Sequence, residues 1–364
     1  MSRPDHRRRC ARANYCRPAM LGAVLLGLAF PMAGQEAPTL HIDGLVYLHY
    51  RYQLGTDSTL GSGAHPNNFD VDRAYINLRG TMRHGISTRV TTDIDPGRPN
   101  TNQLLLRLKY AYVAWQPDGS ALTWKLGEIQ TPLIEWIETL WGFRMQGSVA
   151  LDRTRYLTSS DFGVSVAGNW RDDALDLVAG VYNGEGYNRI PGDQHKDVAA
   201  RISVRLASSD ARGAASGLRL TGYGHLGASN GGGTRSRFAG IISWQSRRLT
   251  LGAELAATRD STADDAPDTP GRVVSAYGVY HLPVAPITLL ARIDAWDPDT
   301  GREPSVPDPA TSRQHRLIAG VAYRLTPDVR LMLDADLLSM HHGSPDNAFE
   351  AHRRSLLFQT EFRF

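Results

Sequence analysis

The sequence predicts an all-β protein, a transmembrane antiparallel β-barrel of about 16 strands whose long third loop folds into the lumen. Two observations predict this fold. Apolar and polar side chains alternate with a period of two along many segments, and the connectors between those segments are alternately short and long. No apolar run reaches the roughly 18 residues that a spanning helix needs, and mean hydropathy is −0.32. A helical membrane protein is therefore excluded.

The N-terminal segment is expected to be a signal peptide covering residues 1–34, followed by the barrel at residues 35–364. An arginine-rich start precedes an apolar stretch from Ala19 to Phe30, and small residues follow it. Both cysteines, Cys10 and Cys16, lie in this segment. The remaining chain can form no disulfide, thiol nucleophile or cysteine-based metal site.

The charge balance argues against nucleic acid as a partner. The whole chain carries 40 Lys and Arg against 37 Asp and Glu, but residues 1–34 hold six arginines and one aspartate. The barrel therefore keeps 34 basic and 36 acidic residues. A chain that is slightly acidic overall lacks the electrostatic signature of a nucleic-acid-binding protein.

Each predicted strand has one apolar and one polar face. In the first, Ile42, Val46 and Leu48 alternate with Asp43 and His49. In the fourth, the apolar face is expected to hold the even-numbered residues from Leu104 to Tyr112. The predicted strands are 40–53, 69–80, 85–95, 102–116, 121–129, 161–170, 174–184, 197–207, 217–227, 235–246, 248–258, 272–282, 286–296, 313–325, 328–340 and 353–364.

Two architectures produce such alternation, and the connectors favour one of them. A soluble sandwich or lipocalin-like barrel buries its apolar face, whereas an outer-membrane barrel turns that face toward lipid. Short turns such as 117–120 and long loops such as 55–68 fall on opposite rims, and a soluble sandwich has no reason to sort its loops in this way. Aromatic residues near the short turns and a C-terminal Phe364 also favour the outer membrane of a Gram-negative bacterium.

The third long connector, residues 130–160, breaks the period of two. Apolar residues from Leu133 to Trp141 recur at helical spacing, with Glu135 and Glu138 on the other side. Because loops of this length are usually functional, we expect it to fold inward and narrow the lumen; the alternative is an external loop docked on the rim. Its later part carries further charges that we place at the constriction, namely Arg144, Asp152, Arg153 and Arg155.

The polar faces of the strands supply the charge of the lumen. Alternation assigns 16 cations and nine anions to it, and the excess is concentrated on the second to fifth strands. Rings of Arg and Lys favour anions in a pore. Alternatively, neighbouring Arg and Asp pair with one another and leave a nearly neutral wall. The expected pore-lining cations are Arg73, Arg79, Arg89, Arg107, Lys109 and Lys125.

Part of the chain resembles the phosphate-selective porin O and P family. The resemblance covers roughly residues 69–170, and the residues that carry it are 72–76 (DRAYI), 109–113 (KYAYV), 127–132 (GEIQTP) and 161–164 (DFGV). It implies a sixteen-stranded, trimeric channel that is either general or anion-preferring. Family members that select phosphate use an arginine ladder and clustered lysines.

This chain departs from that family pattern in its lysines. After the signal segment it has only Lys109, Lys125 and Lys196. Arginine would therefore have to be the main partner of phosphate.

These observations predict a passive channel for small hydrophilic solutes, favouring small anions such as phosphate, with no cofactor, metal or catalytic residue. The alternatives are a general or sugar-permeable porin, a purely structural or adhesive barrel, and an outer-membrane hydrolase. A hydrolase would need a nucleophile and a base near one rim. The only conspicuous candidates are His341 and His342 with Asp346, and His315 with Asp334.

Overall fold

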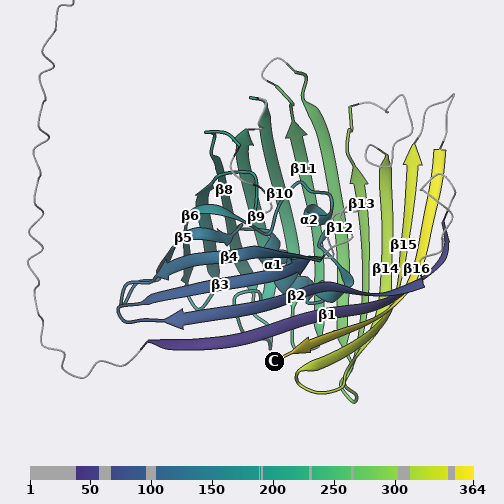
Figure 1. The fold of residues 1–364 in the computed structure, drawn as a ribbon, viewed down its shortest axis with the longest axis horizontal. Coiled ribbons are helices and arrows are strands. Elements are labelled where there is room, and N and C mark those ends of the chain that lie inside the picture. The colour runs from purple at the N-terminus through teal and green to yellow at the C-terminus, as the bar shows by residue number, and fades with distance from the viewer. Residues whose placement is uncertain are drawn as a thin grey trace, which may run out of the picture. The chain divides into compact units, whose positions relative to one another are not determined.

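The structure is a computed structural model that describes residues 38–56, 67–95, 104–187, 189, 192–228, 232–263, 266–301, 312–342 and 349–364. Within these residues, 16 antiparallel strands form a closed barrel in which each strand pairs with its sequence neighbours (Figure 1). β1 and β16 close it: the Gly44 N–H donates to the Phe364 carbonyl at 2.8 Å, and the Phe364 N–H donates back at 3.1 Å. The predicted fold is confirmed. None of the described helices is long and apolar enough to cross a bilayer.

Every predicted strand is present, and the bounds differ by a few residues. The expected signal peptide lies outside the described residues. The strands are β1 (Thr39–Thr56), β2 (Asn67–Thr81), β3 (Ile86–Asp95), β4 (Leu105–Trp115), β5 (Leu122–Gln130), β6 (Ser160–Trp170), β7 (Leu175–Tyr182), β8 (Asp197–Ala207), β9 (Gly217–Ala228), β10 (Thr234–Gln245), β11 (Leu249–Asp260), β12 (Thr269–His281), β13 (Ile287–Asp297), β14 (Arg313–Arg324), β15 (Val329–His342) and β16 (Phe349–Arg363).

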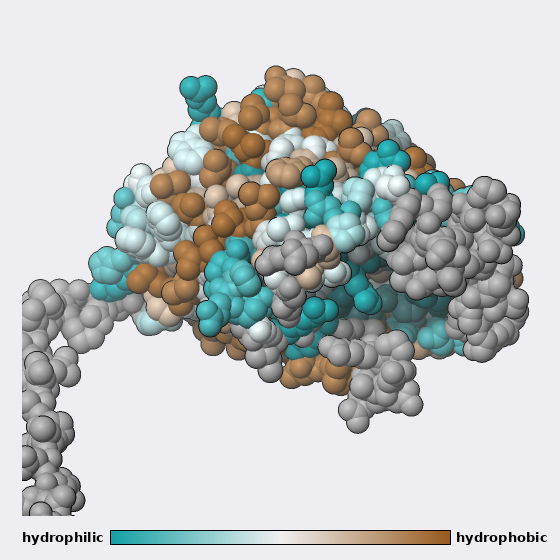
Figure 2. Space-filling view, turned by 90° about the horizontal axis from the view of Figure 1, so that it is seen from above, coloured by the Kyte–Doolittle hydropathy of each residue, from teal (hydrophilic) through white to brown (hydrophobic). Residues whose placement is uncertain are grey.

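The barrel is apolar outside and polar inside. Outward Leu106 and Leu333 are 69% and 60% exposed, whereas inward Asp93 and Arg292 are 0% and 2% exposed. Figure 2 shows hydrophobic side chains over much of the outer surface and hydrophilic ones around the opening. Burying charge while exposing leucine is unfavourable in water but matches a barrel whose outside faces acyl chains.

On β4 the predicted alternation is wrong beyond Lys109. Tyr110 pairs with Thr91 and Leu108 pairs with Thr92, so Lys109 is an extra residue that forms a β-bulge. The bulge reverses the faces of all later residues on the strand. Tyr110 is therefore buried inside the barrel, whereas Val113, which strict alternation placed in the lumen, is 48% exposed on the outer surface.

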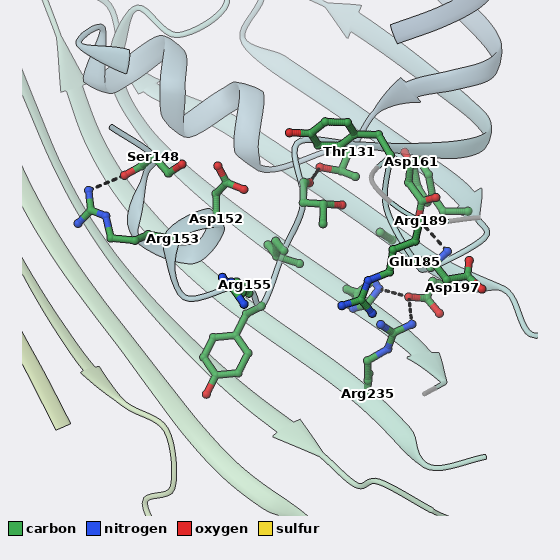
Figure 3. A pocket seen from close by; sticks show the side chains of 18 of the residues that line it. Thr131, Ser148, Asp152, Arg153, Arg155, Asp161, Glu185, Arg189, Asp197 and Arg235 are labelled. Carbon is green, nitrogen blue, oxygen red and sulfur yellow. Dashed lines mark hydrogen bonds and ion pairs between the residues drawn. The ribbon is translucent and has the colours of Figure 1, made fainter. Parts of the chain in front are cut away.

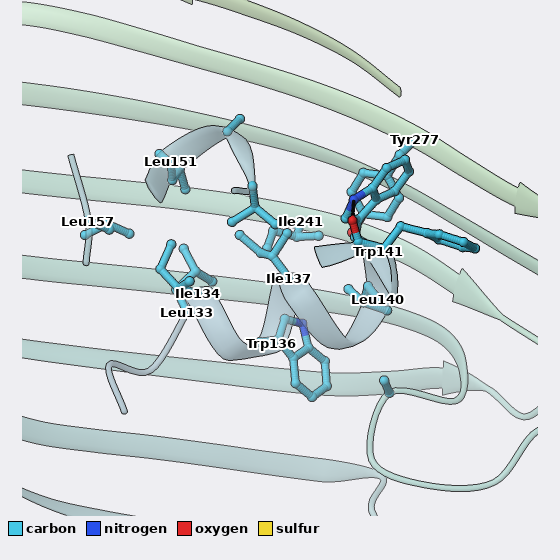
Figure 4. Packing of buried hydrophobic residues seen from close by; sticks show 14 of the residues in the cluster. Leu133, Ile134, Trp136, Ile137, Leu140, Trp141, Leu151, Leu157, Ile241 and Tyr277 are labelled. Carbon is cyan, nitrogen blue, oxygen red and sulfur yellow. Dashed lines mark hydrogen bonds between the residues drawn. The ribbon is translucent and has the colours of Figure 1, made fainter. Parts of the chain in front are cut away.

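The third loop, residues 131–159, folds into the lumen as expected. It contains α1 (Ile134–Trp141), the 3₁₀ helix η2 (Arg144–Gln146) and α2 (Ala150–Arg153). Helix α1 ends at Gly142, whose φ of 68° allows its N–H to donate to the Glu138 carbonyl at 2.9 Å. The apolar side of α1 packs against the inner wall at Ile241 and Tyr277 (Figure 4).

Candidate functional site: the lumen and its third loop

Arginines of the inner wall hold the backbone of the third loop. Four guanidinium groups each donate a hydrogen bond to a loop carbonyl that has no partner in a helix or strand. These bonds satisfy buried backbone acceptors of an irregular segment. Because the four arginines come from separate strands, they fix the loop at points along its whole length. The bonds are Arg201 to Pro132 at 2.8 Å, Arg330 to Gly142 at 3.0 Å, Arg292 to Ser148 at 3.3 Å and Arg237 to Tyr156 at 3.3 Å.

The same arginines, and Arg219 as well, stack on aromatic rings of the loop. The guanidinium carbon of Arg201 lies 4.1 Å from the ring centroid of Trp136, and that of Arg219 lies 5.5 Å away. Arg330 lies 4.3 Å from the Phe143 ring. Cation–π contacts of desolvated groups add to the anchoring. These lumen cations, predicted from alternation, therefore serve mainly to hold the loop rather than to contact solutes.

The loop leaves two open chambers in the lumen. The larger has a volume of about 1060 Å³, and Figure 3 shows side chains that line it. We call it the long-loop chamber, because Glu185 and Arg189 of a long connector line it. The other, the short-turn chamber, has about 380 Å³ and lies toward the short turns. Arg73 and Arg107 line the first, whereas Arg79, Arg89 and Lys109 line the second. The predicted cations of β2, β3 and β4 thus form one basic stripe through both chambers.

The two cations at the end of this stripe in the long-loop chamber share a single carboxylate. Asp93, which is 0% exposed, accepts a hydrogen bond from Arg73 at 2.7 Å and another from Arg107 at 3.1 Å. The three groups together carry one net positive charge. At the other end, Arg79 pairs with Asp43 at 2.8 Å.

The middle of the stripe has neutral partners among the described residues. Lys109 donates to the Tyr75 hydroxyl at 3.1 Å, and Arg89 donates to the Asn77 side-chain oxygen at 2.9 Å. On β5, Lys125 donates to the Gln130 side-chain oxygen at 3.0 Å. Hydrogen bonds to neutral groups hold these side chains in place without cancelling their charge.

Acidic residues of the loop face the stripe across the lumen. Glu138 forms an ion pair with Arg144 at 2.7 Å, and an Asp152 oxygen lies 3.6 Å from the same guanidinium. Glu138 and Arg144 line the short-turn chamber and Asp152 lines the long-loop chamber, so this charged chain connects the two chambers, where we expect the narrow region of the lumen. Burial alone would lower the pKa of Arg144, but Glu138, Tyr75 and Asp152 raise it above its ordinary value.

The remaining predicted loop residues divide between anchoring and lining. Arg153 binds Asp294 on β13 at 2.8 Å and donates to the Ser148 carbonyl at 2.6 Å, so it ties the loop to the wall. Burial and the nearby arginines of β13 and β14 lower the pKa of Arg153. Arg155 and Glu135 are exposed, the first in the long-loop chamber and the second in the short-turn chamber.

Two sets of lumen residues were missed by the sequence reasoning. Tyr110 and Tyr112 line the basic stripe only because of the bulge at Lys109, which no simple period reveals. In the long-loop chamber, Asp197 lies 2.8 Å from His225 and 3.2 Å from Arg235. Strand alternation alone would have placed this second cluster in the lumen.

The structure does not assemble the hydrolase candidates that it describes. His315 is exposed on the outer face of β14, whereas Asp334 is 2% exposed and faces the lumen. Asp346, the proposed partner of His341 and His342, lies outside the described residues. Within the described part of the chain, no group of three or more His, Cys, Asp or Glu side chains could hold a metal ion.

Comparison with known proteins identifies the fold. No family model and no curated protein sequence matches the chain. Solved structures do match: the anion-selective porin from Comamonas acidovorans has a TM-score of 0.65 at 10% identity, covering 90% of this chain and 100% of that one. The fold is that of an outer-membrane porin.

Other solved structures agree. OmpF of Salmonella typhi, in a complex with daunomycin, has a TM-score of 0.61 at 12% identity and covers 89% of this chain and 97% of that one. The outer membrane channel DcaP of Acinetobacter baumannii has 0.59 at 12% identity with the same coverage. Together with the apolar outer surface, this fold makes the chain an outer-membrane barrel of a Gram-negative bacterium.

Proposed function

We propose that the protein is a passive, water-filled diffusion channel that favours small anions such as phosphate. The observation that carries this proposal is the charge of the two chambers. The long-loop chamber is lined by six arginines and four carboxylates, and the short-turn chamber by five cations and three carboxylates. An excess of fixed cations raises the local concentration of anions.

The arrangement of these charges supports the same preference. Lys109 and Arg89 keep their charge because their described partners are neutral, and both line the short-turn chamber next to the narrow region. An anion leaving the Arg73 and Arg107 pair therefore meets further cations before it reaches the short-turn rim. Arginine, with its planar fork of donors, suits phosphate as a partner.

Two further features complete the proposal. We infer that residues 1–34 are removed on export and that three copies assemble, as the resemblance to the phosphate-selective porin family implies. A structure of OmpT from Vibrio cholerae, described as a trimer form, has a TM-score of 0.59 at 11% identity to this chain and covers 90% of it and 100% of that chain. No chemical step, and hence no cofactor, is part of the proposed function.

The test is the competition of phosphate with chloride in a planar bilayer. At constant ionic strength, replacing part of the chloride by phosphate should lower the single-channel current by more than the difference in ionic mobility. The Arg73→Gln variant should lose most of that excess block, whereas Arg212→Gln, on an exposed turn between β8 and β9, should keep it. Current that follows bulk mobility in every variant, with sugars crossing readily, would identify a general porin instead.

A further inference from the structure

The outer surface of β14, β15 and β16 carries polar side chains where neighbouring positions are apolar. His315 pairs with Ser339, and Ser339 pairs with His352, so the three form one row across the three strands. Alternation turns this row outward, since Arg316 next to His315 binds Asp336 inside the barrel. We call His315, Ser339, His352 and the nearby Arg354 the outer polar row.

The outer polar row lies at the upper edge of the apolar belt. Arg354 is exposed and faces the same way as His352, two residues further along β16. The next outward residues toward the short turns are Leu356 and Phe358, which are 40% and 47% exposed. A cationic side chain facing lipid is unfavourable at mid-membrane and tolerated near the headgroups. The row is therefore at the level of lipid headgroups, on the side of the long connectors.

An apolar groove runs beneath the row. It has a volume of about 440 Å³ and is lined mainly by outward side chains of β12 to β15, with His315 and Ser339 at its polar end and the inward residues Asp294 and Arg316 at its base. The small side chains of Ala276 and Ala295 contribute to the groove between larger aliphatic residues. On other strands near the same rim the outward residues are bulky, such as Phe69 and Phe162, which are 83% and 51% exposed.

We propose that the outer polar row and this groove bind a membrane lipid whose headgroup carries phosphate. The Arg354 guanidinium and the N–H groups of His315 and His352 would donate to phosphate oxygens, and one acyl chain would fill the groove. The hydrogen bond of 2.9 Å between the Ser339 hydroxyl and His352 Nδ1 orients that ring. Since strands lie about 4.8 Å apart, the two histidines of the row are about 10 Å apart, within reach of one headgroup.

The first experiment measures lipid binding to the folded, full-length protein in detergent by native mass spectrometry. The probes are bisphosphorylated lipid A and the same lipid after removal of both phosphates. The wild type should bind lipid A more tightly, and Arg354→Gln should weaken that binding about tenfold, because a charge-assisted hydrogen bond is lost. Arg259→Gln is the matched control, since Arg259 is an outward, exposed arginine at the same rim but lies 3.7 Å from Asp268; it should change the affinity less than twofold.

The second experiment tests the groove. Ala295→Phe fills it from the outside, so affinity for lipid A should fall while heat-modifiable electrophoresis still reports a folded barrel. Equal binding of the two lipids, or unchanged binding by a folded Arg354→Gln variant, would overturn the proposal. So would an Ala295→Phe variant that changes the oligomeric state and leaves lipid binding intact, because the surface would then join copies of the chain.

Discussion

Arg201 is the wall residue whose loss should most clearly release the third loop. Its guanidinium is 5% exposed, donates to the Pro132 carbonyl at 2.8 Å, stacks on Trp136 at 4.1 Å and forms an ion pair with Asp176. Replacing it with alanine removes a charge-assisted bond and a cation–π contact and leaves Asp176 buried without its partner. The bond to Pro132 and the contact with Trp136 hold the loop, and losing a charge-assisted hydrogen bond and a desolvated cation–π contact costs loop docking about 3 kcal/mol. The Asp176 pair joins β8 to β7, so its loss destabilises the barrel wall and not the docking of the loop.

A loss of about 3 kcal/mol from docking raises the undocked population about a hundredfold, since each 1.4 kcal/mol is a factor of about ten. Limited trypsin digestion of the folded barrel in detergent measures this population, because Arg144, Arg153 and Arg155 are cleavable once the loop leaves the wall. When reclosing is fast, the cleavage rate follows the open population.

The control is Arg212→Ala, which removes an exposed arginine far from any described loop contact. It should leave the rate of cleavage within residues 131–159 unchanged. If Arg201→Ala folds and its loop is cleaved no faster than in the wild type, the anchoring described above is wrong.

Three further outcomes follow from the same contacts. Asp93→Asn should strengthen anion preference in bilayer recordings, because Arg73 and Arg107 lose their shared counter-charge, while the folded barrel loses about 3 kcal/mol in urea unfolding. Truncating Arg144 to alanine should widen the narrow region and raise single-channel conductance; an unchanged conductance would place the narrowest point elsewhere. Val113→Lys should destabilise the barrel by about 2 kcal/mol in lipid vesicles, because that side chain faces outward. A variant as stable as the wild type would mean that residue 113 faces the lumen and that β4 alternates without a bulge.

Much of the fold could be predicted because a barrel wall is built by a local rule. Each strand must present one face to lipid and one to the lumen, so the pattern of residues such as Leu331 and Leu333 against Asp334 and Asp336 identifies both the strand and its orientation. The lengths of the connectors then show which end of each strand lies at the rim of the short turns and which at the rim of the long loops. The inward third loop could also be anticipated, since α1 has an apolar side that needs a partner.

The parts that could not be predicted depend on non-local contacts. The bulge at Lys109 arises from the pairing of β4 with β3, so the sequence of β4 alone does not reveal that Tyr110 faces inward. Likewise, alternation places both Arg201 and Arg73 on the lumen face of a strand. In the structure Arg201 is buried against the loop, whereas Arg73 lines the long-loop chamber. Only the packed structure separates anchoring arginines from those that solutes can reach.

The most direct test of the central claim is the reversal potential of the purified channel in a planar bilayer under a gradient of KCl. Because cations exceed carboxylates in both chambers, the reversal potential should be displaced toward the chloride equilibrium value. Lys109→Gln should reduce this displacement. A reversal potential on the potassium side of zero would mean that the lumen favours cations and that the proposed anion preference is wrong.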